Sequence, residues 1–289
     1  MNWIIVVAVL VVIGFVLDRE IYFYEGVHLG PRVQAWLYDR WSKKYDEGKR
    51  ESQLHDNEML AGPLLVALKD VPEPFILDFA TGTGRLSYTL LSRPEFNGRI
   101  IALDLSQGML EQAASKLSRA SSTGQESAVP PLSAKGARVE LIRHQSLPLP
   151  FPDAAFDAVC ALEVLELFPN MDEPLAEFIR VLRPGGVLLT SRGTEASGRK
   201  AKVKDKSEFG SLLAKYGFET FEISPWWKLF DRVLATKNGS SNPARARKLS
   251  EVMRCPACGQ TQWQEEAGKL RCGNCGKELS VTAEGIVLN

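Results

Sequence analysis

The sequence predicts an α/β protein with a doubly wound, mostly parallel sheet, because strand-like and helical segments alternate along its middle. Phe75–Ala80 and Arg99–Leu105 are short apolar runs, as expected of buried strands. Gln107–Arg119, which follows them, places Met109, Leu110 and Ala113 at helical spacing. Strands separated by helices of about 10–15 residues are typical of parallel sheets that carry helices on both faces.

The other elements follow in chain order and bring the predicted sheet to seven strands. The five further strands are expected at Val139–Arg143, Phe156–Leu162, Gly186–Ser191, Phe218–Ile223 and Arg232–Lys237. Helices are expected within Gly30–Lys69, where Pro31 suits a helix start, and at Arg85–Ser92, Glu173–Leu182 and Glu208–Tyr216. Ser118–Arg138 is rich in Ser, Gly, Ala and Pro without periodicity, so it is expected to be a loop.

The composition is that of an ordinary folded chain. The 289 residues are 45% hydrophobic and 24% charged, which excludes a disordered or fibrous protein. Lys plus Arg and Asp plus Glu both number 35, so no net charge draws the chain to nucleic acid. The basic run Arg199–Lys206 is expected to be a solvated face, with lipid head groups or phosphates as the alternative partners.

The N-terminal segment Trp3–Leu17 contains no charged residue. As a helix it would span roughly 22 Å, against roughly 30 Å for a bilayer core, so neighbouring residues would have to contribute. We expect residues 1–24 to be a membrane anchor, in preference to a buried core helix or a cleaved signal peptide, which would need a basic start. Every Lys and Arg follows this run, which predicts a single-pass membrane protein with its catalytic domain on the cytoplasmic side.

A glycine turn follows the first predicted strand. Gly82 and Gly84 stand between that strand and a helix, where the main chain can approach a ligand and free helical N–H groups point toward it. Asp104 ends the second strand, where a carboxylate can accept hydrogen bonds from both hydroxyls of a ribose. Dinucleotide enzymes use a related Gly-x-Gly-x-x-Gly turn, and this alternative stays open although Ser87 replaces the third glycine.

Three further features favour a different ligand. Asp78 at the end of the first strand would repel a pyrophosphate but suits an ammonium or a sulfonium. Leu149–Asp153 precedes the fourth strand, and Val181–Gly186 leads into the fifth. Over Trp36–Lys237 this combination resembles the class I S-adenosylmethionine-dependent methyltransferases, and within them the branch that includes the quinone-biosynthesis C-methyltransferases. The resemblance implies a Rossmann-like sheet and S-adenosylmethionine as the cofactor.

The resemblance also implies which residues bind that cofactor. Tyr38–Asp46 is similar to the N-terminal helix that covers the cofactor in this family, Met109 and Gln145 match positions beside the adenine, and Ala80 replaces the usual first glycine. Gln145 stands where an aspartate is common, and its oxygen can still accept the adenine amino hydrogen. The predicted cofactor-binding residues are Tyr45, Asp78, Ala80, Gly82, Gly84, Asp104, Leu105, Met109, Gln145, Ser146 and Leu162.

No catalytic residue can be assigned from the sequence. A sulfonium methyl is already activated, so its transfer mainly needs an acceptor held in line and water excluded. A poorly nucleophilic acceptor also needs a base, but Leu167 replaces the histidine common in relatives. His28, His55 and His144 are the remaining candidates, and for each a solvated or structural role is favoured over that of a base.

Four of the five cysteines form two Cys-x-x-Cys pairs, Cys255 with Cys258 and Cys272 with Cys275. Two residues between thiolates let both face one ion, and four thiolates complete a tetrahedral zinc shell. The segment resembles a zinc ribbon, and Zn2+ in it is expected to be structural because no coordination position remains open. Disulfides are the less favoured alternative.

Together these features predict a membrane anchor at 1–24, a methyltransferase domain at 30–237, a linker at 238–252 and a zinc ribbon at 253–289. The expected acceptor is a lipophilic small molecule such as a quinone precursor or a lipid, which a membrane-anchored enzyme would meet at raised effective concentration. The alternatives are an rRNA or protein methyltransferase whose ribbon recognises its substrate, and a cofactor-binding adaptor without turnover. The sequence does not set the oligomeric state.

Overall fold

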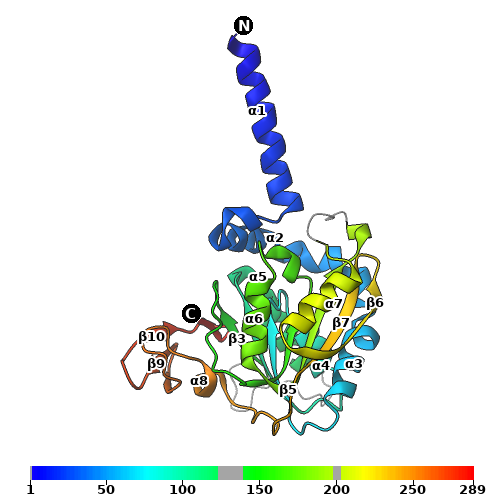
Figure 1. The fold of residues 1–289 in the computed structure, drawn as a ribbon. Coiled ribbons are helices and arrows are strands. Elements are labelled where there is room, and N and C mark those ends of the chain that lie inside the picture. Colours follow the sequence, from blue (N-terminus) through cyan, green and yellow to red (C-terminus); the bar gives the residue numbers. More distant parts are fainter. Residues whose placement is uncertain (1, 123–138, 198–202) are drawn as a thin grey trace.

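The computed structural model describes residues 2–122, 139–197 and 203–289. Its centre is a sheet of order β11-β3-β2-β1-β4-β5-β7-β6 (Figure 1). The strands are β1 (Phe75–Phe79), β2 (Arg99–Asp104), β3 (Val139–Arg143), β4 (Phe156–Ala161), β5 (Leu182–Gly193), β6 (Phe218–Trp227), β7 (Phe230–Lys237) and β11 (Ile286–Leu288). The pairs from β11 to β5 are parallel, and β7 is antiparallel to both neighbours.

Helices cover both faces of this sheet, as the alternating pattern predicts. They are α2 (Pro31–Gln53), α3 (Gly62–Ala67), α4 (Arg85–Leu91), α5 (Gln107–Ser122), α6 (Asp172–Val181) and α7 (Lys206–Lys215), with short turns η1 (Arg19–Phe23), η2 (Val27–Leu29), η3 (Asn57–Ala61), η4 (Leu165–Leu167) and η5 (Glu195–Ser197). Because successive strand residues point to opposite faces, Ile76 packs in one core with α3, α4 and α5. Leu77 packs in the other with α6 and α7.

The sheet has eight strands instead of the seven predicted. The extra strand, β11, comes from the end of the sequence and pairs in parallel with β3, from Ile286 opposite Leu141 to Leu288 opposite Arg143. An edge strand leaves a row of unpaired main-chain groups, and β11 satisfies those of β3. Three apolar residues after a cysteine-rich segment are too short a signal to indicate this pairing.

The remaining C-terminal elements form a small module beside β3 (Figure 1). It contains α8 (Leu249–Val252) and a three-stranded antiparallel sheet of β8 (Trp263–Glu266), β9 (Lys269–Cys272) and β10 (Glu278–Ser280). Val252, Met253 and Trp263 are buried in the same core as Leu77. The module, called the ribbon below, therefore packs on the main domain instead of standing apart.

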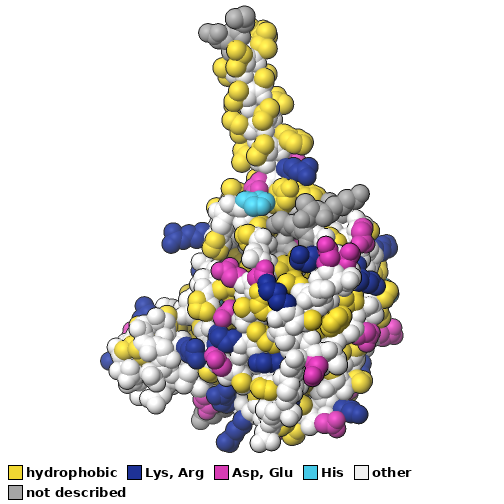
Figure 2. Space-filling model, in the orientation of Figure 1, with side chains coloured by type: hydrophobic (Ala, Val, Ile, Leu, Met, Phe, Trp, Pro, Cys, Tyr) yellow, Lys and Arg dark blue, Asp and Glu magenta, His cyan; other side chains and the backbone are white. Residues whose placement is uncertain are grey.

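The predicted membrane anchor is wrong for this structure. α1 (Asn2–Asp18) leaves the body of the molecule and exposes apolar side chains all round (Figures 1 and 2). It ends after 17 residues, and Arg19 and Glu20 follow at once. Within the described part of the chain, no helix combines the length and the hydropathy needed to cross a membrane. The predicted localisation as a single-pass membrane protein is therefore not supported.

Two predicted segments lie partly outside the described residues. Most of the loop predicted at 118–138 and the start of the basic run at 199–206 fall there. On the face of the molecule shown in Figure 2, cationic and anionic side chains are interspersed over the body.

Candidate active site

A cavity of about 420 Å³ opens at the carboxyl ends of the central strands. In doubly wound sheets ligands bind at this edge. Two groups of residues form most of its lining. The loop wall follows β1, β2 and β3 and consists of Ala80, Gly82, Asp104, Leu105, Met109, His144, Gln145, Ser146 and Leu147. The apolar wall comes from η2, the start of α2 and the β4–α6 segment, and consists of Val27, Gly30, Pro31, Gln34, Val164, Leu167, Phe168, Pro169 and Glu173.

The glycine turn after β1 uses left-handed backbone at three positions, Ala80, Gly82 and Gly84. At Gly82, φ is +56° and a Cβ would meet no atom within 4 Å, so its bare surface is open to the cavity. At Gly84, φ is +74° and a Cβ would lie 3.0 Å from the Cβ of Ala113 on α5. The second glycine therefore serves helix packing, while the first clears space for a ligand.

Asp104 stands at the tip of β2, only 6% exposed, and lines the cavity. Its Oδ2 accepts a hydrogen bond from the N–H of Gly82 at 2.8 Å, and its Oδ1 accepts one from Ser106 at 2.8 Å. A carboxylate has about four acceptor sites, so further hydroxyls can still donate to it. Burial raises the pKa of the Asp104 carboxyl to about 6, although the two main-chain hydrogen bonds oppose that shift.

Asp78 and Gly84, which were predicted to contact the cofactor, do not line the cavity. The Asp78 carboxylate is buried beneath the turn and accepts hydrogen bonds from the hydroxyls of Thr81 and Ser87, both at 2.7 Å. Burial raises its pKa. In this arrangement Asp78 supports the shape of the turn. The other nine predicted residues all line the cavity.

Helix α2 is fastened to the loop wall by two carboxylates. Asp39 Oδ1 accepts hydrogen bonds from the Ser106 hydroxyl at 2.6 Å and from the Gly108 N–H at 2.8 Å. Asp46 accepts one from the Thr83 hydroxyl at 2.6 Å and pairs with Lys116 at 2.7 Å. These contacts hold α2 over the glycine turn, as the similarity of Tyr38–Asp46 to a covering helix implies.

Two tyrosines of α2 face the cavity as neutral hydroxyls. Burial raises the pKa of both Tyr38 and Tyr45, so neither ionises near neutral pH. The Tyr38 hydroxyl donates to the carboxylate of Glu25. Tyr45 was among the predicted cofactor-binding residues, and it lines the cavity.

An ion-pair network at Glu163 was not predicted as part of the site. Glu163 lines the cavity just after β4 and pairs with Lys49 of α2 and with Arg85, whose Nη1 lies 3.2 Å from Oε1. Arg85 also pairs with buried Asp56. The positive φ of 54° at Glu163 is a rare backbone conformation for a residue other than glycine, and it marks this position as unusual.

None of the three histidines is poised as a base. His28 is exposed and pairs with Glu20 at 2.9 Å, and the ring of exposed His55 lies 5.1 Å from that of Trp227. His144 lines the cavity, but Nδ1 lies 3.0 Å from the amide of Asn289 and Nε2 lies 3.3 Å from the Pro148 carbonyl. Burial lowers its pKa. A structural role, favoured from the sequence, agrees with these contacts.

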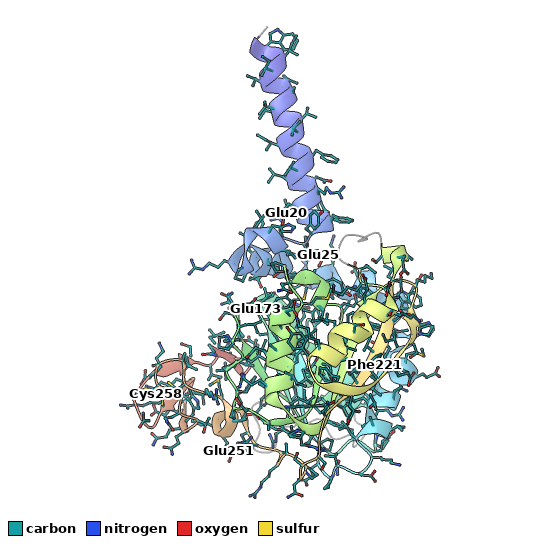
Figure 3. The ribbon with its side chains drawn as sticks, in the orientation of Figure 1. Glu20, Glu25, Glu173, Phe221, Glu251 and Cys258 are labelled. Atoms are coloured by element: carbon teal, nitrogen blue, oxygen red, sulfur yellow. The ribbon has the colours of Figure 1, made fainter. Side chains whose placement is uncertain are left out.

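The four paired cysteines gather in the ribbon, where Figure 3 marks Cys258. Their sulfur atoms all lie within 4.8 Å of one another. The Cys255–Cys275 and Cys258–Cys272 distances are 3.6 and 3.7 Å, too long for disulfides. Tetrahedral zinc with bonds of about 2.3 Å would separate its sulfurs by ~3.8 Å, so the four thiols fit this metal.

Comparison with known proteins agrees with this geometry. The methyltransferase domain family matches residues 77–190, which run from β1 into β5. The chain contains a class I S-adenosylmethionine-dependent methyltransferase domain. A SAM-dependent methyltransferase from Aquifex aeolicus has the same fold, with a TM-score of 0.50 at 21% identity over 68% of this chain and 97% of that one.

The methyltransferase domain is related in sequence to quinone-biosynthesis enzymes. It is 31% identical to the demethylmenaquinone methyltransferase of Thermobifida fusca, over 55% of this chain and 60% of that protein. It is 32% identical to a ubiquinone/menaquinone biosynthesis C-methyltransferase of Francisella tularensis, over 39% of this chain and 40% of that protein. The chain thus spans about half the length of these relatives.

Proposed function

We propose that this protein transfers a methyl group from S-adenosylmethionine to a lipophilic small molecule such as a quinone precursor. The observation that carries the proposal is the contrast between the two walls of one cavity. The loop wall has the carboxylate and bare turn that suit a nucleoside, whereas the apolar wall offers Val27, Leu167 and Phe168 to a second ligand. A cavity that places both ligands together suits a transfer between them.

One polar group on the apolar wall is uncommitted. Gln34 is only 9% exposed, yet within the described residues its side-chain amide has no hydrogen-bond partner. Glu173, the other polar side chain of that wall, is exposed. Gln34 lines the cavity, so its amide can donate a hydrogen bond to an oxygen of the acceptor. An apolar ring that bears a hydroxyl or a carbonyl meets both requirements.

The relatives point to the same class of acceptor, since both carry quinone-biosynthesis names. When bound, S-adenosylmethionine supplies an electrophilic methyl group on a sulfonium. Transfer to a ring carbon would form a carbon–carbon bond and break the methyl–sulfur bond. The electron pair of that bond would stay on sulfur, and the methylated ring carbon would afterwards release its proton to solvent. The protein's part is to hold Asp104 against the ribose, Gln34 against the ring oxygen, and α2 over both so that water is excluded.

The test is to incubate the full chain with methyl-labelled S-adenosylmethionine and three acceptors in separate reactions: demethylmenaquinol, a total RNA preparation and a protein extract. We expect label in the organic phase of the first reaction, with one S-adenosylhomocysteine released per methyl group. Asp104→Ala is the control that should remove the signal. Label confined to RNA or protein, or no release of S-adenosylhomocysteine with any acceptor, would refute the proposal.

We also propose that Cys255, Cys258, Cys272 and Cys275 hold one structural Zn2+, because their spacing fits its tetrahedral shell. Four thiolates leave no position for a substrate. Elemental analysis of protein purified without added metal should give one zinc per chain. A chain that holds no zinc, with all four thiols titratable, would refute this assignment.

A further inference from the structure

The segment from His144 to Pro150, which leads from β3 toward β4, carries four of the nine residues of the loop wall. Its residues His144, Gln145, Ser146 and Leu147 all line the cavity. The segment forms no regular secondary structure of its own. Its shape therefore depends on what holds it from outside.

Asn289, which follows β11, holds the first end of this segment. Asn289 follows β11, and its main-chain N–H donates to the Arg143 carbonyl at 3.1 Å. Its side-chain amide lies 3.0 Å from His144 Nδ1, so the amide donates there and Nε2 of the neutral ring keeps its proton for the Pro148 carbonyl. Asn289 thus fixes both the orientation and the tautomer of a ring that forms part of the cavity wall.

The ribbon holds the second end. The N–H of Arg254, immediately before the first cysteine, donates to the Pro150 carbonyl at 2.7 Å. The carboxylate of Glu140 on β3 accepts a hydrogen bond from the N–H of Leu249 at 3.1 Å, which fixes the start of α8 to the same strand. The two ends of the segment are therefore fastened to Asn289 after β11 and to Arg254 of the ribbon.

β11, which Asn289 follows, contributes side chains to both cores. Ile286 is buried with α5 and β2, whereas Val287 is buried with Trp263 and Leu270 of the ribbon. Val281 bridges to Val287, and the Thr282 N–H donates to the Ile286 carbonyl at 2.9 Å. Unfolding the ribbon would release β11 and, with it, Asn289.

We infer that the ribbon is a positioning part of the cofactor site: its folded state, stabilised by the metal at the four cysteines, fixes segment 144–150 in its binding shape, and Asn289 is the positioning residue. The inference rests on the proposed function for the identity of the cofactor and of the metal. A small module has little core of its own, so metal binding supplies much of its folding free energy. Metal occupancy and cofactor affinity are then coupled, and the coupling acts equally in both directions.

The first experiment titrates the zinc-loaded full chain with S-adenosylhomocysteine by calorimetry. Asn289→Ala removes one partly buried hydrogen bond and should weaken binding about three- to tenfold. In steady state it should raise the KM for S-adenosylmethionine by a similar factor and leave kcat and the acceptor KM unchanged. Gln264→Ala, on exposed β8 of the same module, is the matched control and should bind as the native chain does.

The second experiment follows zinc release to a chromophoric chelator, with and without saturating S-adenosylhomocysteine. We expect the bound ligand to slow release severalfold in the native chain and much less in Asn289→Ala. Unchanged affinity in Asn289→Ala, or release that the ligand does not slow, overturns the inference while leaving the proposed function intact. Failure of the native chain to bind S-adenosylhomocysteine would instead refute the proposed function itself.

Discussion

The loop wall and the apolar wall of the cavity are built on different principles. In the loop wall, main-chain N–H groups and short polar side chains hold Asp104 and the glycine turn at fixed distances. In the apolar wall, hydrophobic side chains dominate, and the amide of Gln34 has no partner within the described residues. A wall fixed by main-chain hydrogen bonds suits one invariant ligand, whereas an apolar wall sets its preference by shape and by a single polar contact.

The difference also separates the effects that mutations should have. Changes in the loop wall should alter cofactor binding, and changes in the apolar wall should alter acceptor binding. The predictions below test this separation.

Asp104→Ala should have the largest effect. It removes the acceptor of two ribose hydroxyls and of two main-chain N–H groups, so affinity for S-adenosylhomocysteine should fall about 100-fold. Calorimetry measures this directly. The milder Asp104→Asn keeps one oxygen acceptor, so its affinity for S-adenosylhomocysteine should fall less. Equal affinity in the native chain and in both variants would contradict the assignment of Asp104 to the ribose.

Gly82→Ala and Gly84→Ala should separate the effect of the glycine turn on ligand binding from its effect on helix packing. Gly84→Ala brings a Cβ within 3.0 Å of Ala113 at a left-handed position, and should lower the free energy of unfolding by roughly 2 kcal/mol. Gly82→Ala meets no protein atom, so it should cost about 1 kcal/mol of stability but weaken cofactor binding more than Gly84→Ala does. Denaturant unfolding measures the stability of both variants, and calorimetry measures their affinity for S-adenosylhomocysteine. A larger loss of stability in Gly82→Ala, or a larger loss of affinity in Gly84→Ala, would contradict the prediction.

Gln34→Leu should act on the acceptor alone. Losing one hydrogen bond to the acceptor's oxygen should raise the acceptor KM about tenfold, with cofactor affinity unchanged. The matched control is Gln264→Leu, which makes the same replacement on an exposed strand of the ribbon. A rise in the KM for S-adenosylmethionine instead would show that Gln34 acts in cofactor binding.

The smallest effect expected is a pH dependence of cofactor binding. The free Asp104 carboxyl has a pKa raised to about 6, so it holds a proton at lower pH and must lose it before both ribose hydroxyls can donate. Affinity should be constant above pH 7 and fall as the pH drops through 6, about fourfold by pH 5.5. Asp104→Asn should flatten this profile, and a native profile without a decrease would exclude Asp104 as the titrating group.

The sequence predicts the loop wall far better than the apolar wall. Gly82 and Asp104 lie at fixed offsets from strands that periodicity identifies, so their meeting at one sheet edge follows from the fold class. The same reasoning places Asp78 near the turn, but cannot tell that its carboxylate points down to Thr81 and Ser87. That orientation depends on burial and on side-chain hydrogen bonds, which spacing does not encode.

Gln34 shows why the apolar wall is harder to predict. It lies in an amphipathic helix whose polar residues mostly face solvent, and only the packing of α2 over the sheet turns this one toward a cavity. The fold itself was predicted for strands β1 to β7 in order. The eighth strand, β11, was not predicted, because its partner β3 lies far away in sequence. Three apolar residues also carry no information about which edge of the sheet they join.

The position of β11 has a consequence for how the chain acquires its structure. The contact between Asn289 and His144 spans 145 residues, so β3 has no partner on its outer side until residues 286–288 have left the ribosome. Contacts between such distant segments form slowly, and an open strand edge can pair with another chain meanwhile. Nascent chains of this protein should therefore depend on chaperones until β11 has been translated and has paired with β3.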